Sequence, residues 1–235
     1  MHRDRHHRVV TSNPFDDSVH VALYAERAAQ MVPAYRDIHR LATVLIDERA
    51  QPDARILVLG AGGGLETKSF AEAKPGWTFD AVDPSAAMLD LAAQNLGAHA
   101  ARVRMHHGYI DDAPPGPFAA ATSLLTLHFL PCDQRRDTAA RVRQRLAPGA
   151  PFVVAHLSFP QRDDDERELW IGRHIANLIA SGIDSADVDK ARSAIASDVP
   201  ILSPEQDRAV LLDAGFTDVT EFFSAFTFRG WVGYA

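Results

Sequence analysis

The feature that most constrains the fold of this chain is a short apolar run that stops at a cluster of glycines. Residues 55–60 read RILVLG, and residues 60–64 read GAGGG. A continuous apolar run of this length is typical of a strand buried on both faces of a parallel sheet. Glycines at its end let the backbone approach a ligand and point amide groups toward it. The segment therefore predicts a buried strand followed by a ligand-binding turn into a helix.

Strands and helices then alternate as far as residue 158. Further strands are expected at 77–83, 101–108, 118–127 and 151–158, with helices at 65–73 and 85–97 and another from Cys132, capped by Asp133 and closed by Pro148 and Gly149. Strands separated by helices predict a parallel sheet covered on both faces. A helix at 203–216 precedes two closely joined β-rich runs, which predict an antiparallel hairpin. We therefore expect an α/β, Rossmann-like, mostly parallel sheet with a C-terminal antiparallel hairpin.

The length of 235 residues suits one α/β domain, residues 1–235, with covering segments. Residues 16–50 show helical spacing that Pro33 divides, so we expect 11–50 to form an N-terminal helical cover. Residues 160–200 lack strand signals and predict a helical lid inserted between strands. Trp170, Arg173 and His174 lie within one helical turn of this lid. They are candidates for contact with an acceptor, although helix packing explains them equally well.

Composition excludes several classes of protein. A net charge of −7 argues against a broad nucleic-acid surface. An arginine cluster in the helix after Cys132 is expected on its solvated side: Arg135, Arg136, Arg141, Arg143 and Arg145. The longest apolar run, 118–130, is too short to span a bilayer, and the charged first ten residues do not resemble a secretory signal. With Cys132 as the single cysteine, we expect a cytoplasmic protein without membrane association.

An acidic residue follows the glycine loop at the spacing expected for a ribose-binding carboxylate. Asp83 ends the second expected strand, 19 residues past Gly64. An acidic side chain there can accept hydrogen bonds from both hydroxyls of an adenosine ribose. The dinucleotide fingerprint needs a third glycine at the position that Leu65 occupies, which disfavours NAD. The glycine loop and Asp83 together predict recognition of an adenosine cofactor other than a dinucleotide.

The ordered segments ILVLGAGGGLET, DAVDPSAAMLDLA, HGYIDD, LLTLHFL and LAPGAPFVVAH resemble the motifs of the class I S-adenosylmethionine-dependent methyltransferases. They span residues 56–156. VPAY at 32–35 and LLDAGFTDV at 211–219 are similar to the carboxy-S-adenosylmethionine synthase subgroup and its close methyltransferase relatives. The resemblance implies S-adenosylmethionine as cofactor, with S-adenosylhomocysteine as product. It also implies a set of cofactor contacts that runs from the methionine end and the glycine loop through the ribose and adenine to the sulfonium: Tyr35; Gly60, Ala61, Gly62 and Gly64; Asp83 and Pro84; Met88, Gly108, Tyr109 and Ile110; and Leu124.

The chain departs from this family at three positions. Val58 stands where the family usually has an acidic residue, so one contact to the amino group of the cofactor is absent. Tyr109 replaces the usual aspartate near the adenine amine. Ile179 stands where the carboxy-cofactor synthases carry an arginine for the extra carboxylate. We therefore expect methyl transfer, with two alternatives: a carboxy-S-adenosylmethionine synthase-like enzyme of tRNA modification, or a noncatalytic binder of S-adenosylmethionine or S-adenosylhomocysteine.

Methyl transfer from a sulfonium is an in-line displacement, in which a general base is optional. The candidates for catalysis are His128 and His156 at the carboxyl edge of the sheet and Arg173 in the lid. A structural or solvent-facing role is the commoner one for such histidines. No metal is expected, because neither the N-terminal histidines nor the pair at 106–107 has ligand spacing. We expect a small-molecule acceptor, and homodimerisation remains open.

Overall fold

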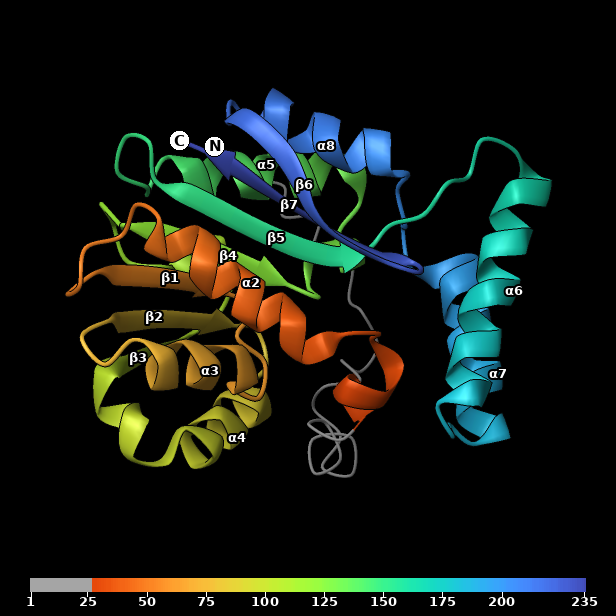
Figure 1. Cartoon of the computed structure of the whole chain (residues 1–235), viewed down its shortest axis with the longest axis horizontal. Coiled ribbons are helices and arrows are strands. Elements are labelled where there is room, and N and C mark those ends of the chain that lie inside the picture. The colour runs from red at the N-terminus through yellow and green to blue at the C-terminus, as the bar shows by residue number, and fades with distance from the viewer. Residues whose placement is uncertain (1–26) are drawn as a thin grey trace, which may run out of the picture.

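The structure, a computed structural model, describes residues 27–235 and is built around a seven-stranded sheet (Figure 1). The strand order is β3-β2-β1-β4-β5-β7-β6. The strands are β1 (Arg55–Leu59), β2 (Thr78–Asp83), β3 (Val103–His107), β4 (Ala120–Leu124), β5 (Pro151–Leu157), β6 (Thr217–Ala225) and β7 (Phe228–Tyr234). Strands β1 to β5 pair in parallel, whereas β7 runs antiparallel to β5 and β6. The expected Rossmann-like fold with a C-terminal hairpin is confirmed.

Helices cover both faces of the sheet. They are α2 (Tyr35–Asp47), α3 (Leu65–Ala73), α4 (Ala86–Leu96), α5 (Cys132–Arg143), α6 (Asp164–Ala180), α7 (Ser185–Ser193) and α8 (Pro204–Asp213). Val58 of β1 packs in one apolar cluster with residues of α2 and α3, and its neighbours Leu57 and Leu59 pack in a second cluster with residues of α5 and α8. This alternation follows from the two-residue period of a strand. The two clusters form the two core layers of the domain.

Several helix boundaries lie where the sequence predicts them. The Ser85 hydroxyl accepts a hydrogen bond from the amide of Met88 at 3.2 Å and caps α4, which ends at Gly97 with φ +53°. Pro33 separates the helical residues 27–31 from α2. The expected N-terminal cover, 11–50, is therefore described only from residue 27 onward, and its earlier part lies outside the described residues.

The expected strand 118–127 is too long at its carboxyl end. β4 stops at Leu124, because Leu125 adopts a left-handed conformation with φ +59°. The next residues, Leu127–Phe129, form a 3₁₀ turn. An apolar run without glycine or proline gives no signal of such a turn, and here the chain bends at the edge of the sheet while Leu127 and His128 stay buried.

Two other boundaries shift by a few residues. The expected strand 101–108 begins only at Val103, after a 3₁₀ segment whose Arg102 donates hydrogen bonds to the carbonyls of Ala71 and Trp77 at 2.7 and 2.9 Å. Helix α5 is preceded by Pro131 at the cap position, so Asp133 lies in its first turn and is not the cap. It ends at Arg143, before the expected stop at Pro148.

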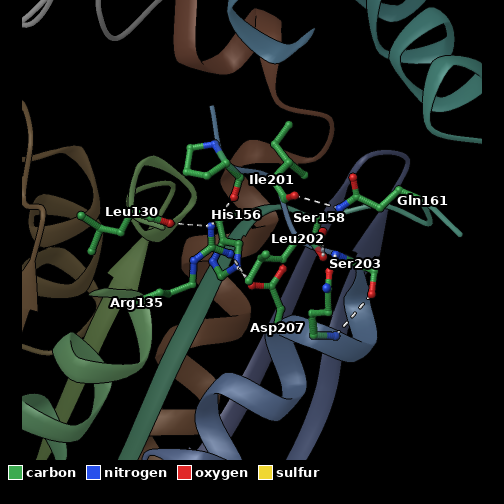
Figure 2. Close-up of polar contacts among 11 residues, drawn as sticks. Leu130, Arg135, His156, Ser158, Gln161, Ile201, Leu202, Ser203 and Asp207 are labelled. Carbon is green, nitrogen blue, oxygen red and sulfur yellow. Dashed lines mark hydrogen bonds and ion pairs between the residues drawn. The ribbon is translucent and has the colours of Figure 1, made fainter. Parts of the chain in front are cut away.

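The expectation that the arginine cluster of α5 is solvated is wrong for Arg135. This side chain is fully buried and forms an ion pair with Asp207 of α8. Its other terminal nitrogen donates to the carbonyls of Leu130 and Pro200 at 3.1 and 3.0 Å (Figure 2). Arg135 thus joins α5, the loop after β4 and the segment that leads into α8. Helical spacing alone could not reveal this, because Asp207 lies 72 residues away.

The segment between β5 and α8 forms α6, α7 and a π-helical turn, Ala194–Asp198. Figure 1 shows α6 and α7 beyond the carboxyl end of β5. The carboxylate of Asp163 caps α6 by accepting the amide of Glu166 at 2.8 Å. His174 then ties α6 to the β6–β7 turn, with 2.7 Å between its Nδ1 and the Thr227 hydroxyl. None of the helices within residues 27–235 is long and apolar enough to cross a bilayer.

Candidate functional site

The glycine loop between β1 and α3 has a backbone that other residues could not easily adopt. Gly60, Gly62 and Gly64 have φ values of +75°, +49° and +78°. A Cβ on Gly60 would lie 2.2 Å from the Thr126 hydroxyl oxygen. The amides of Gly60 and Ala61 both donate to the Val82 carbonyl, at 2.8 and 3.1 Å, which folds the loop across the end of β2. The loop therefore leads into the amino terminus of α3 in a fixed, buried conformation at the carboxyl end of β1.

Asp83 fixes this loop to the second strand. Its carboxylate accepts the amide of Gly62 at 2.8 Å and the amide of Ser85 at 2.9 Å, and the residue is buried. Asp83 thus orients the glycine loop in addition to the ribose role that the resemblance implies. The sequence did not show this second role, because a side chain at a strand end gives no sign of which loop amide it accepts.

The end of β3 forms the next wall of the candidate site. The amide of Gly108 donates to the Asp83 carbonyl at 3.0 Å, and a Cβ on Gly108, with φ +140°, would lie 2.1 Å from a carboxylate oxygen of Asp112. That carboxylate accepts the amide of Tyr109 at 2.9 Å and closes a short 3₁₀ turn, Ile110–Asp112. Ile110 is buried, whereas the Tyr109 side chain is 64% exposed. Asp112 was missed from sequence, although its spacing from Tyr109 is that of a capping box.

The remaining residues assigned to the cofactor lie around the same edge. Ala61 and Met88 are buried, and Pro84 is half-buried, with its carbonyl 2.9 Å from Nε2 of His107. Tyr35 and Leu124 are both buried in the apolar cluster of α2 and α3. The fold therefore draws the predicted set from α2, the glycine loop, the carboxyl ends of β2, β3 and β4, and the first turn of α4.

Glu66, in the first turn of α3, is a buried carboxyl that the sequence analysis missed. It is 6% exposed and accepts a hydrogen bond from the Thr122 hydroxyl of β4. Burial raises the pKa of Glu66 to about 8, and the hydrogen bond from Thr122 only partly opposes this. A signal was present: Glu66 stands four residues before the buried Phe70, on the inward stripe of α3.

The structure brings His128 and His156 together, with ring centroids 6.3 Å apart, in a buried polar network. His156 lies on the sheet face covered by α5 and α8, and its Nε2 is 3.1 Å from Asp207 Oδ1 (Figure 2). The pKa of His128 is lowered well below its usual range, first by burial and then by His156 and Arg135. These contacts are those of a structural network. A catalytic role for either histidine stays a prediction.

The three lid residues separate in the structure. His174 is buried, which lowers its pKa to about 4, and it anchors α6 to Thr227. The Trp170 ring packs edge-on to Phe226, at 6.3 Å between centroids. Arg173 is exposed, with its guanidinium carbon 4.6 Å from the Trp170 ring centroid. Of the three, Arg173 is the one whose charged group faces solvent.

The histidine pair at 106–107 has other partners. His106 Nε2 lies 2.7 Å from the buried Asp80, which also pairs with Arg55 at 2.6 Å. Within residues 27–235, no group of three or more His, Cys, Asp or Glu side chains gathers in a way that could hold a metal ion. His2, His6 and His7 lie outside the described residues.

Comparison of the sequence finds a matching protein family and full-length relatives. Residues 57–152 match the family described as "Methyltransferase domain". The carboxy-S-adenosyl-L-methionine synthase of Pseudomonas fluorescens (strain Pf0-1) is 30% identical over 223 residues, which cover 91% of this chain and 89% of that protein. The synthase of Ectopseudomonas mendocina (strain ymp) is also 30% identical, over 93% of this chain and 91% of its own.

Solved structures of methyltransferases share the fold. A putative O-methyltransferase from Nostoc punctiforme PCC 73102 superposes with a TM-score of 0.67 at 16% identity, over 92% of this chain and 60% of that chain. Human N-acetylserotonin methyltransferase in complex with SAM superposes with a TM-score of 0.57 at 15% identity, over 93% of this chain and 59% of that chain. At such identities these structures speak for the fold alone, whereas the synthases match over almost their whole length.

Proposed function

Because this chain belongs to the class I S-adenosylmethionine-dependent methyltransferases, we propose that it transfers the methyl group of S-adenosylmethionine to a small-molecule acceptor by in-line displacement. The observation that carries the proposal is the glycine loop held against Asp83 by the Gly62 amide at 2.8 Å. The amides of Gly60 and Ala61 donate to the Val82 carbonyl as well, so the loop has its shape before any ligand arrives. Such preorganisation lowers the cost of binding.

The residues at this edge fit the chemistry of the cofactor. The carboxylate of Asp83 suits the polar ribose of the cofactor, and Met88 and Ile110 offer apolar surface for adenine. When bound, S-adenosylmethionine supplies an electrophilic methyl group on a positively charged sulfonium. The protein then has to align the acceptor and exclude water, for which the buried Leu124 and Tyr35 provide apolar walls.

We propose that segments outside the sheet bind the acceptor and determine which acceptor is used. Helix α6, with Arg173, lies beyond the carboxyl edge, and α2 covers one side of it (Figure 1). Lids that close over a site exclude water and complete it after the substrate enters. We propose that residues 160–200 close in this way together with the N-terminal helices predicted at 16–50, of which the structure describes residues 27–50. We also propose a protein of the cytoplasm, for which the single Cys132 is the support.

A second candidate is synthesis of a carboxylated cofactor, and the full-length synthase relatives favour it. Against it stands Ile179, which is 61% exposed near the end of α6 and offers no cation for an extra carboxylate. The exposed Arg173, six residues earlier on the same helix, is the cation that could replace it.

Calorimetry with S-adenosylmethionine, S-adenosylhomocysteine, carboxy-S-adenosylmethionine and NAD separates the candidates. We expect the first two to bind, the carboxylated form to gain nothing over S-adenosylmethionine, and NAD to bind weakly. Tighter binding of the carboxylated form would favour the synthase, and NAD as the tightest ligand would overturn the proposal. Turnover with a panel of phenols, amines and carboxylates, followed as S-adenosylhomocysteine by mass spectrometry, identifies the acceptor class. Binding without turnover of any of them would favour a noncatalytic binder.

A further inference from the structure

A carboxyl group lies beside the very position at which Val58 lacks one. Val58 of β1 is fully buried and pairs in parallel register with Thr122 of β4, and the Thr122 hydroxyl donates to the Glu66 carboxylate. Glu66 therefore brings an acidic group from α3 onto the strand pair β1–β4 at the level of Val58. The helix thus places a carboxyl group in the layer where β1 itself has an apolar side chain.

This carboxyl group lies close to the edge where the cofactor is expected. Thr122 and Leu124 are two residues apart on β4 and face the same side of the sheet, since side chains alternate along a strand. Two residues span about 7 Å, so the hydroxyl that holds Glu66 is one such step from the residue assigned to the sulfonium. On β1, Val58 is likewise two residues from Gly60.

The surroundings of Glu66 leave an ionised carboxylate without a counter-charge. Val58, Phe70 and Leu124 belong to the apolar cluster of this layer, and within residues 27–235 no Lys, Arg or His forms an ion pair with Glu66. Burying an unpaired carboxylate costs several kcal/mol, which is why burial raises the pKa of Glu66 to about 8. A glutamine or methionine would pack here without that cost. A cation that arrives with a ligand would remove the cost.

We propose that Glu66 receives the α-ammonium group of S-adenosylmethionine, in place of the β1 carboxylate that Val58 has lost. This inference rests on the proposed function, because it assumes that the cofactor lies along the glycine loop. The competing explanation is that Glu66 only favours the amino terminus of α3 by its charge. That explanation predicts an effect on stability and none on the recognition of any one part of the cofactor.

The test compares Glu66→Gln with Glu72→Gln, a matched change at an exposed glutamate of the same helix. Binding of two ligands is measured by calorimetry: S-adenosylhomocysteine, which has the amino-acid end, and 5′-methylthioadenosine, which lacks it. We expect Glu66→Gln to weaken S-adenosylhomocysteine by roughly tenfold to a hundredfold, as for a lost charge-assisted bond, and to leave 5′-methylthioadenosine within twofold. Glu72→Gln should change neither. An unchanged affinity for S-adenosylhomocysteine, or an equal loss for both ligands, would overturn the proposal.

A second measurement uses the unaltered protein, so it does not depend on how the variant folds. A thioether analogue that lacks only the α-amino group should bind roughly tenfold to a hundredfold more weakly than S-adenosylhomocysteine. Equal binding of the two would refute the role of Glu66. If neither S-adenosylhomocysteine nor 5′-methylthioadenosine binds the unaltered protein, the proposed function fails instead, and the two failures are thus distinguishable.

Discussion

The buried ion pair between Arg135 and Asp207 should be among the most sensitive points of the fold. Arg135→Met leaves the buried Asp207 carboxylate without its guanidinium partner and removes the donor to the carbonyls of Leu130 and Pro200 (Figure 2). Breaking a buried pair from one side costs about 3 to 5 kcal/mol. For a chain of this size, that corresponds to a melting temperature lower by roughly 6 to 20 °C.

The assay is urea unfolding followed by tryptophan fluorescence, because Trp231 is buried with its ring 5.6 Å from that of His156. Arg136→Met is the matched control: the Arg136 side chain is 48% exposed on the same helix, and its loss should cost less than about 0.5 kcal/mol. The double variant Arg135→Met/Asp207→Leu removes both charges. It should lie only about 2 kcal/mol below the unaltered protein, because the two carbonyls still lose their donor.

Two results would refute this reasoning. If Arg135→Met lies within 1 kcal/mol of the unaltered protein, the pair does not hold α5, α8 and the segment before α8 together. If the deficit of the double variant equals the sum of the deficits of Arg135→Met and Asp207→Leu, the charges are not coupled, and the contact in the structure carries no net energy.

Three further predictions concern the site. Asp83→Ala should weaken S-adenosylhomocysteine by roughly tenfold to a hundredfold in calorimetry, because the ribose hydroxyls lose a charged acceptor and the glycine loop loses its anchor, whereas the exposed Asp90→Ala should not; an unchanged affinity would remove Asp83 from the site. Relative to Glu66→Gln, the unaltered protein should lose about 2 kcal/mol of its free energy of unfolding between pH 6 and pH 8, since the pKa of Glu66 is about 8 when folded and near 4.5 when unfolded, so that the folded chain holds the extra proton and loses stability as it is removed. The lowered pKa values of His128 and His174 act in the opposite direction but are common to both proteins, so they cancel in the difference; an identical pH profile in the variant would contradict the prediction. Arg173→Ala should impair turnover more than cofactor binding, and hydrogen exchange at residues 160–200 should slow when cofactor and acceptor bind; full activity together with unaltered exchange would make the lid merely structural.

The sheet was predictable because its signals are local. Continuous apolar runs marked the inner strands, and glycine, proline or a capping serine marked most ends, as at Ser85 and Gly97. The end of β4 was not predictable in this way, because the left-handed turn at Leu125 is built from an apolar residue held by the Ala155 carbonyl at 2.6 Å. That contact comes from the neighbouring strand, which local spacing does not reveal.

The same distinction between local signals and distant contacts explains which site residues could be predicted. Gly60, Gly62 and Asp83 were recognisable because their residue types are required at a strand end that faces an adenosine ligand. Glu66 was missed because a carboxylate in a first turn normally faces solvent, where it favours the helix terminus. Its burial depends on Thr122, 56 residues away, which only the paired strands β1 and β4 bring beneath α3.

The choice between methyl transfer and synthesis of a carboxylated cofactor depends on where a cation can stand. A carboxylated sulfonium substituent brings a negative charge into a site from which water is excluded, and this costs several kcal/mol unless the charge is paired. A methyl group needs no such partner, and Ile179 provides none. To pair with a carboxylate, Arg173 has to leave the face of the Trp170 ring. The contact between a guanidinium and an aromatic ring is worth about 0.5 to 1 kcal/mol at an exposed site, which is less than a charge-assisted hydrogen bond. The lid could therefore regain a cation at little cost. The affinity for the carboxylated form, measured with and without Arg173, thus distinguishes the two activities where a shared fold and 30% identity do not.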